Sequence, residues 1–137
     1  MSGGAKDAAG GIDESLYSRQ LYVMGHDAQR RMQDSRVLIV GLDGLGVETA
    51  KNVILAGVKS VGLLDNTPTS YADLGSQFYL SEGDIGKPRA EACASKLAEL
   101  NPYVPVSVVT SELTVDTVAG YRVVVMVDIP SKQHVEI

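Results

Sequence analysis

The sequence predicts an α/β domain with a parallel sheet, and two observations carry that prediction. First, residues 36–40 form a short apolar run that leads into a turn containing Gly41, Gly44 and Gly46; a helical pattern follows, and a second apolar run ends at Asp65. Second, apolar runs alternate with helical patterns along the rest of the chain, as in sheets with right-handed helical crossovers. The order strand, glycine turn, helix, strand, acid is the one with which a Rossmann-like domain builds a nucleotide site.

The individual elements follow from the spacing of apolar residues and from the turn residues between them. Helical spacing predicts helices over residues 16–24, 27–33, 44–56 and 88–100, with a short helix or turn at 116–120. Strands are predicted at residues 36–40, 60–64, 106–109 and 122–127. Gly25 separates the first two helices, and Pro88 stands in the first turn of its helix, where its missing N–H costs little. The last strand is apolar throughout, which is typical of a strand buried on both faces.

The helix over residues 44–56 includes the apolar positions Leu45, Ala50, Val53 and Ile54. Residues 66–86 show no clean period and contain several glycines, so we expect a long crossing segment, and such segments are usually functional or interfacial.

The topology and the domain limits follow from this order of elements. We expect the strand order 3-2-1-4, with ligands binding at the carboxyl ends of the strands, where the order reverses. Residues 1–11 are rich in Gly and Ala and are predicted to be a flexible tail. Residues 12–137 are predicted to form one Rossmann-like domain, the N-terminal part of a larger doubly wound domain, because such sheets normally continue with further strands.

The composition argues against several classes of partner and site. A net charge of −5 argues against nucleic-acid and anionic-membrane partners. No segment is apolar enough to cross a bilayer, and no signal-peptide pattern is visible. Cys93 is the only cysteine, which excludes an internal disulfide and a cysteine-built metal site and indicates a reducing cytoplasmic or nuclear compartment. It lies on the apolar face of the helix at 88–100, so we expect core packing. The isolated His26 and His134 lack metal-ligand spacing, and no metal site is predicted.

The glycine turn departs from the phosphate-binding pattern at one position. In G-x-G-x-x-G the second glycine would fall at position 43, which is Asp43 here. A carboxylate at that position would crowd and repel a bound phosphate. Two interpretations stay open: Gly44 and Gly46 serve only tight packing between strand and helix, or the turn still forms a working ATP site.

Five segments in order resemble the ubiquitin-activating enzyme family. They are LYSRQLYVMG, GLDGLGVETAKNVILAGVKSV, DLGSQFYL, DIGKPRAEA and LAELNPYVPV, and the similarity runs from about residue 16 to residue 130. The chain is most similar to the first, N-terminal ThiF/MoeB-like adenylation repeat of that family, and nearly as similar to the small subunit of the SUMO-activating heterodimer. The resemblance implies two homologous halves, one of which binds ATP and Mg²⁺ and adenylates the C-terminus of ubiquitin or a ubiquitin-like protein.

The resemblance also implies which half this is. Active members have glycine at the position of Asp43, and an arginine that faces the ATP phosphates at the position of Ser76. Asp65, Lys87 and Asp128 match the family's ribose acid, its D-x-G-K lysine and an acid that helps to hold Mg²⁺. Because the phosphate-contacting set is broken, the resemblance implies the inactive half, with no cofactor bound by this half itself. The degenerate site so implied comprises Gly41, Gly44, Gly46, Asp65, Lys87 and Asp128.

Arg19 carries the one catalytic role that the resemblance implies. In this family the Tyr-x-Arg-Gln segment reaches across to the ATP of the partner half, where an arginine supplied in trans neutralises developing phosphate charge. Simpler interpretations stay open: Arg19 in a surface salt bridge, Asp65 as a solvated acid at a strand end, and Lys87 as a solvated residue before a helix.

Three functions remain in competition on the sequence. The first is the non-catalytic adenylation half of a ubiquitin-activating enzyme, with the active half and a ubiquitin-like protein as partners. The second is an autonomous nucleotide-binding enzyme, either a dehydrogenase or a homodimeric adenylyltransferase. The third is an interaction module without nucleotide chemistry.

Overall fold

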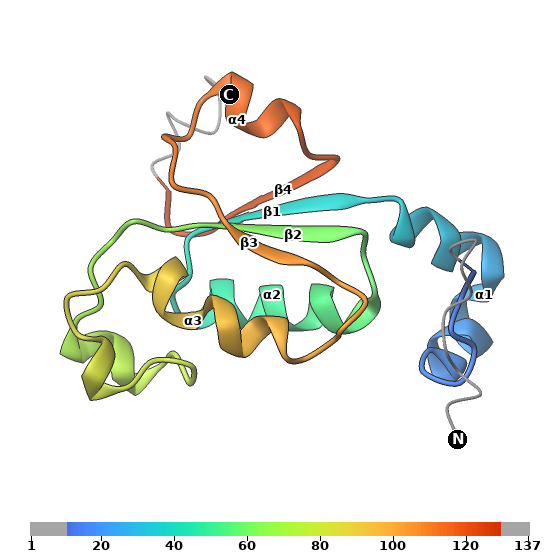
Figure 1. Cartoon of the computed structure of the whole chain (residues 1–137), viewed down its shortest axis with the longest axis horizontal. Helices are drawn as coiled ribbons and strands as arrows, with labels where there is room; N and C mark the ends of the chain where they lie inside the picture. Colours follow the sequence, from blue (N-terminus) through green and yellow to red (C-terminus); the bar gives the residue numbers. More distant parts are fainter. Residues whose placement is uncertain (1–10, 130–137) are drawn as a thin grey trace.

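The computed structural model describes residues 11–129, which contain a four-stranded parallel sheet flanked by helices (Figure 1). The strands are β1 Arg36–Val40, β2 Ser60–Leu64, β3 Val106–Val108 and β4 Val123–Met126. The helices are α1 Ser18–Gln33, α2 Gly44–Ala56, α3 Arg89–Ala98 and α4 Val115–Ala119, with 3-10 turns at η1 Tyr71–Gly75 and η2 Glu82–Asp84. Apart from Gly11, the predicted tail lies outside the described residues, as do residues 130–137.

The sheet has the predicted order, β3-β2-β1-β4, so the order reverses between β1 and β4. In the register of the sheet, Val37 of β1 lies opposite Val61 of β2 on one side and Val123 of β4 on the other. β1 is therefore a central strand, and the fold class expected from the sequence is confirmed.

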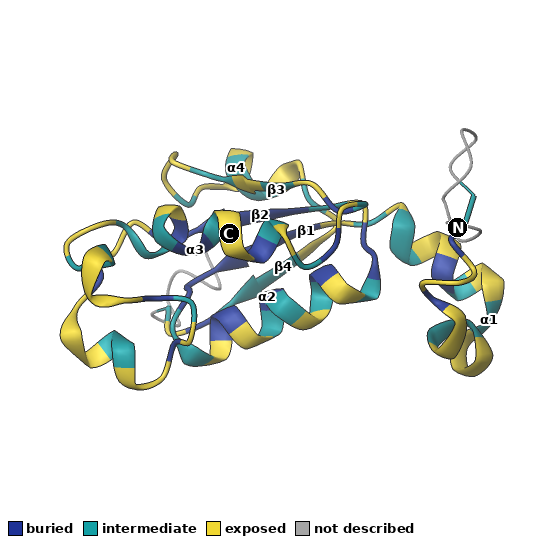
Figure 2. Cartoon of the chain, turned by 60° about the horizontal axis from the view of Figure 1, so that its bottom comes forward, coloured by how far each residue is buried: buried dark blue, intermediate teal, exposed yellow. Residues whose placement is uncertain are grey.

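Two layers cover the sheet, one on each face (Figures 1 and 2). Ile39 of β1 and Leu63 of β2 pack against α2 and α3 in the larger core cluster. Leu38 and Val40 point the other way and pack against the segment that contains α4. Alternate residues of a strand face opposite sides of a sheet, so the continuous apolar run of β1 reflects burial on both faces.

One prediction about burial was wrong. The last strand was expected to be buried on both faces, but Val123 is 46% exposed and the rest of β4 is half-buried. The reason is position: among the described residues β4 is an edge strand, paired only with β1.

The N-terminal helix is broken at the predicted glycine. Gly25 has φ +83° inside α1, so residues before and after it form two helical segments joined by a kink. This left-handed backbone is accessible to glycine and strained for other residues. α1 leads directly into β1 and therefore lies at the amino ends of the strands (Figure 1).

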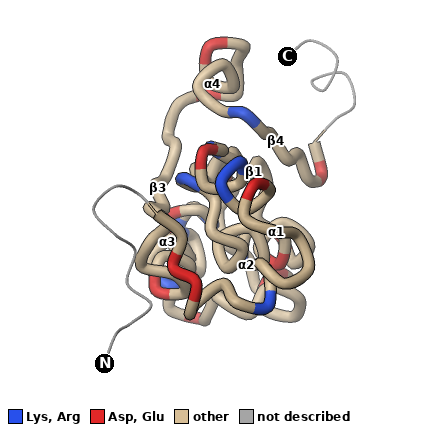
Figure 3. The backbone as a smooth tube through the Cα atoms, turned by 90° about the vertical axis from the view of Figure 1, so that its right-hand side faces the viewer, with Lys and Arg blue, Asp and Glu red and all other residues tan. Residues whose placement is uncertain are grey.

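Basic and acidic positions are interspersed along the described part of the chain (Figure 3). No helix within residues 11–129 combines the length and the hydrophobicity that crossing a bilayer requires.

Candidate functional site: the crevice at the carboxyl ends of the strands

A cleft of about 730 Å³ lies where the strand order reverses. Its walls include Gly41 after β1, Asp65 after β2, and Val127 and Asp128 after β4. This is where a doubly wound sheet binds its ligands, so the structure places a cleft at the position that the topology predicts.

The glycines of the turn allow very close packing between β1 and α2. Gly41 has φ +95°, and a side chain there would collide with the carbonyl oxygen of Val127. A side chain at Gly46 would collide with the carbonyl oxygen of Gly41. At Gly44 an added Cβ would lie 2.8 Å from the carbonyl oxygen of Ser76. All three glycines therefore have a packing role that is independent of any phosphate.

Asp43 caps the helix that would hold a phosphate. Its Oδ1 accepts a hydrogen bond of 2.9 Å from the backbone N–H of Gly46 in the first turn of α2. An aspartate at this position stabilises a helix through that bond and through its charge at the positive end of the helix dipole. A phosphate would use the same N–H groups and the same dipole. The carboxylate therefore occupies part of the anion site as well as repelling an anion.

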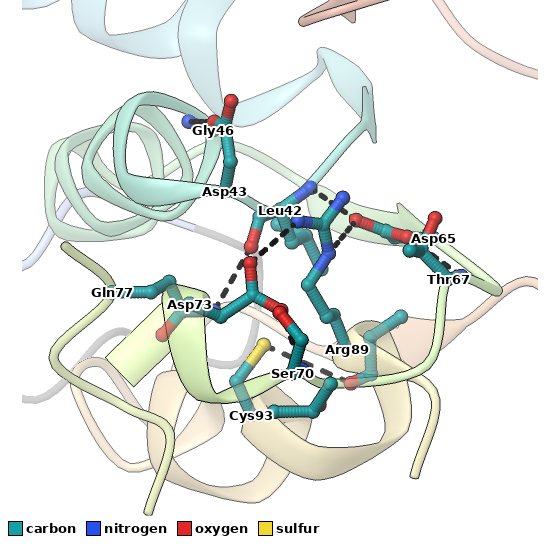
Figure 4. A network of polar contacts seen from close by, with 12 residues as sticks. Leu42, Asp43, Gly46, Asp65, Thr67, Ser70, Asp73, Gln77, Arg89 and Cys93 are labelled. Atoms are coloured by element: carbon teal, nitrogen blue, oxygen red, sulfur yellow. Dashed lines mark hydrogen bonds and ion pairs between the residues drawn. The ribbon is translucent and has the colours of Figure 1, made fainter. Parts of the chain in front are cut away.

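Asp65 is buried and fully engaged, with only 5% of its surface exposed. Its Oδ2 accepts hydrogen bonds from the N–H of Leu42 at 2.7 Å and from Nε of Arg89 at 2.8 Å (Figure 4). Its Oδ1 accepts a hydrogen bond of 2.9 Å from the N–H of Thr67. The interpretation of Asp65 as a solvated acid is wrong. A ribose hydroxyl would have to share or displace these internal partners.

Arg89 is the main site residue that the sequence interpretation missed. Besides Asp65 it binds Asp73, whose Oδ1 lies 3.1 Å from Nη1 of the arginine. Burial alone would lower the pKa of Arg89, but the two carboxylates outweigh it and raise that pKa, so the guanidinium stays charged. The sequence does show an arginine at the start of a predicted helix and an acid at the end of a predicted strand. That pattern does not say that the two side chains pair with each other.

Asp73 is held by a capping box as well as by Arg89. Ser70 and Asp73 exchange the two hydrogen bonds of this motif at the start of η1. Burial alone would raise the pKa of Asp73, but the bonds from the N–H of Ser70 and from Arg89 outweigh it and lower that pKa. The crossing segment is thus tied to the end of β2 by two ion pairs that share Arg89, one with Asp65 and one with Asp73 (Figure 4).

The crossing segment also lies over the glycine turn. Gln77 is buried, and its Nε2 donates a hydrogen bond of 3.0 Å to the carbonyl oxygen of Leu42. Ser76 packs against Gly44 and is exposed. Ser76 therefore lies beside the turn, at the position where the family resemblance implies a phosphate-facing arginine. Its short hydroxyl side chain carries no charge.

The structure brings together most, but not all, of the predicted site residues. The three glycines and Asp65 meet at the turn and the cleft, and Asp128 lines the cleft from the end of β4. Asp128 is exposed and has φ +54°, a left-handed conformation that is uncommon outside glycine. Lys87 is exposed and is not among the cleft-lining residues; its carbonyl oxygen accepts hydrogen bonds from the N–H and hydroxyl of Thr69.

The side chains that line the cleft carry more negative than positive charge. Asp65, Asp73 and Asp128 line it together with a single cation, Arg89, which leaves two net negative charges. Arg89 is already paired with two carboxylates. Phosphate sites in proteins supply Arg, Lys or unoccupied helix N–H groups. Among the described residues, no group of three His, Cys, Asp or Glu side chains is placed to hold a metal ion.

Cys93 packs in the core, as its position on the helix predicts. Its side chain is inaccessible, and burial raises the pKa of the thiol to about 11. The thiolate is the reactive form of cysteine, so this residue is not suited to nucleophilic chemistry.

Arg19 lies apart from all of these residues, at the amino ends of the strands. Its side chain is exposed on α1 beside a hollow of about 420 Å³ that Tyr17, Gln20 and Asn101 also line. The structure shows no ion pair or side-chain hydrogen bond of Arg19 within residues 11–129. The surface salt bridge that was one open interpretation is therefore not formed with any described residue.

Comparison with known proteins places this geometry in a family. The sequence model of the ThiF family matches residues 17–129. Ubiquitin-like modifier-activating enzyme 1 of Homo sapiens is 56% identical over 126 residues, which cover 92% of the chain and 12% of that enzyme. Ubiquitin-activating enzyme E1 1 of Schizosaccharomyces pombe is 57% identical with the same coverage. The chain thus spans about an eighth of the length of these relatives.

Solved structures support the same fold at lower sequence identity. The E. coli tRNA N6-threonylcarbamoyladenosine dehydratase TcdA aligns with a TM-score of 0.74 at 22% identity, covering 91% of this chain and 53% of that one. At this identity the likeness shows the fold alone. The ThiF model covers the sheet, its crossovers and the crevice, and the high identity to the ubiquitin-activating enzymes runs through the same region: the chain belongs to the ThiF family.

Proposed function

We propose that this chain is the N-terminal, non-catalytic adenylation half of a ubiquitin-activating enzyme. The whole protein would use ATP to adenylate the C-terminus of ubiquitin or a ubiquitin-like protein. The support is the identity of more than half of the residues to enzymes of that name, of which this chain corresponds to 12%. The active half and the ubiquitin-like protein would be its partners.

One observation carries the assignment to the non-catalytic half: charged side chains of the chain itself pair with polar groups around the crevice that a nucleotide would use. Asp43 takes the N–H of Gly46, and Arg89 is paired to Asp65 and Asp73. The N–H of Gly46 and the guanidinium of Arg89, two groups that would favour a nucleotide, are thus engaged by the protein itself. ATP and Mg²⁺ would belong to the whole protein, with neither bound by this half.

Arg19 is proposed to act in the ATP site of the partner half. It lies on the outer face of the first segment of α1 with Tyr22 and Val23, three and four positions along the helix. These two apolar side chains are 93% and 82% exposed. An arginine that has no side-chain partner among residues 11–129 and lies beside exposed apolar side chains suits a surface that another domain covers.

The alternative is an autonomous nucleotide-binding enzyme. The fold is compatible with it, since a solved structure of TcdA, similar at a TM-score of 0.74, is a complex with ATP. The charge of the crevice argues against it. Calorimetric titration of ATP and of NAD into this chain separates the two proposals: the inactive half binds neither tightly, and a micromolar dissociation constant for either would favour the alternative.

Arg19→Ala in the whole protein tests the assignment directly. We expect adenylation, measured as ATP–pyrophosphate exchange, to slow on the order of 10²-fold, the usual cost of losing one transition-state charge contact. Arg30→Ala is the matched control, because Arg30 is also exposed on α1 but pairs with Asp27 of the same helix. Unchanged exchange in Arg19→Ala with an unchanged melting temperature would contradict the role in trans.

A cytoplasmic or nuclear setting also stays a proposal. It rests on the single cysteine, which is free and buried in the structure.

A further inference from the structure

The carboxyl end of α2 is held by two glutamine side chains of α1. The carbonyl oxygen of Ala56 accepts a hydrogen bond of 2.7 Å from Nε2 of Gln20 and one of 3.1 Å from Nε2 of Gln29. Gln20 also donates to Oε1 of Gln29 at 2.7 Å. We call Gln20, Gln29 and the carbonyl group of Ala56 the amide clamp. The last carbonyls of a helix have no partner within it, and the clamp satisfies one of them.

The clamp joins the two segments of α1 across their kink. Gln20 precedes Gly25 and Gln29 follows it, and Gln29 is 0% exposed. Gly25 has φ +83°, and no atom lies within 4 Å of the place where its Cβ would be. The first segment of α1 would pivot at this residue. The bond between the two glutamines, and their shared bond to α2, fix the angle at that point. A buried amide with these partners is costly to release.

Tyr17, which precedes Arg19 in the chain as Gln20 follows it, also anchors the first segment of α1. It is buried, and its hydroxyl accepts a hydrogen bond of 2.8 Å from Nδ2 of Asn101. Its ring lies over Gly57, where an added Cβ would come within 2.6 Å of it. Arg19 therefore projects outward between two anchored neighbours, Tyr17 and Gln20.

We propose that the amide clamp positions Arg19 for the partner's ATP site, an inference that rests on the proposed function. Gln20 and Gln29 contact neither nucleotide nor substrate in this role and are positioning residues. A long arginine contributes to a transition state only if its helix is held in place, and a shift of about 1 Å in a positioned group can lower a rate by up to about 10²-fold.

The test measures whether Gln20 acts through Arg19. In the whole protein, Gln20→Ala and the length-matched Gln20→Met remove the donor to Ala56 and Gln29. We expect ATP–pyrophosphate exchange to fall by about tenfold or more, well beyond what the change in melting temperature accounts for. In an Arg19→Ala background the same substitutions should change the rate by about twofold or less, because residues that act as a unit are not additive.

Asn52→Ala is the control, since Asn52 also uses its amide to bind a carbonyl of α2, but it is exposed and its partner is Glu48 of its own helix rather than a residue of α1. If exchange is lost in Arg19→Ala but is normal in Gln20→Met, the positioning role of the amide clamp is overturned, and the role of Arg19 stands. An equal loss in both backgrounds would also overturn it, because Gln20 would then act without Arg19. Normal exchange in Arg19→Ala would contradict the role of Arg19 in trans and with it the clamp, whereas the assignment to the non-catalytic half is tested separately by the ATP titration.

Discussion

At the scale of single residues, the notable feature is a group of three paired charges, Asp65, Arg89 and Asp73, at the end of the sheet where doubly wound folds bind their ligands. Asp65 lies at the end of a central strand, where desolvation would penalise a lone carboxylate. Arg89 removes that penalty and at the same time fixes the crossing segment through Asp73. One arginine therefore stabilises the acid at the end of β2 and ties the crossing segment to it.

Replacement of Arg89 should be strongly destabilising. Arg89→Met keeps most of the side-chain volume but leaves Asp65 charged, buried and unpaired with an arginine. We expect the free energy of unfolding to fall by about 3–5 kcal/mol, the usual effect of breaking a buried pair by removing one partner. Urea denaturation at neutral pH measures this. Arg30→Met, which breaks an exposed pair on α1, should have little effect.

The same variant should alter the response to acid. The lowered pKa of Asp73 means that its carboxylate stabilises the fold above the ordinary value of 3.8, and that this contribution is lost as the pH falls through the lower, folded value. In Arg89→Met one cause of the lowered pKa is gone. The difference in unfolding free energy between wild type and variant should therefore shrink below about pH 4. A difference that stays constant from pH 7 to pH 3 would contradict the ionic origin of the effect.

At the scale of elements, α2 links the two ends of the molecule. Its first turn is capped by Asp43 beside the crevice. At its other end the carbonyl oxygen of Ala56 accepts a hydrogen bond from Gln20, in the segment that carries Arg19. The amino end of this helix thus has a side-chain cap where an active nucleotide fold would leave N–H groups for the ligand.

Substitution of Asp43 should separate capping from nucleotide binding. Asp43→Ala should lower the free energy of unfolding by about 1 kcal/mol, while Asp43→Asn, which retains a capping oxygen, should cost clearly less. Asp43→Gly should not produce ATP binding, because Ser76 still supplies no charge and Arg89 remains paired. Denaturation curves and calorimetric titration provide the two readouts. Tight ATP binding by Asp43→Gly would show that Asp43 alone closes the site.

The sequence predicted the local elements better than the site. Residues 36–40, 44–56 and 60–64 match the structure at both ends, because glycine and turn signals bound them on each side. The pairing of Asp65 with Arg89 was missed because it joins residues 24 positions apart through tertiary packing. The two S-x-x-D capping boxes at Ser70 and Ser81 were readable signals in a segment without periodicity. The capping role of Asp43 was also available from its place before a helix.

At the scale of the whole molecule, the described sheet has two different edges. β3 is three residues long, whereas β4 is an apolar strand beside the central β1. An apolar groove runs next to it, lined by Val37, Val53 and Val125 among others. Val123 of β4 lies in the same groove and is 46% exposed. Exposed apolar edge strands favour pairing with another chain.

The chain of 137 residues should therefore self-associate through β4. Val123→Lys should reduce the association, because a lysine on an edge strand opposes strand pairing and breaks the apolar groove. Leu45→Lys is the control: Leu45 is more exposed than Val123, but it lies on α2 at the crevice end and belongs to no sheet edge. Light scattering over a range of concentrations measures the mean mass. If both substitutions reduce it equally, general surface hydrophobicity is the cause, and a monomeric wild-type chain at all concentrations would contradict the role of the edge.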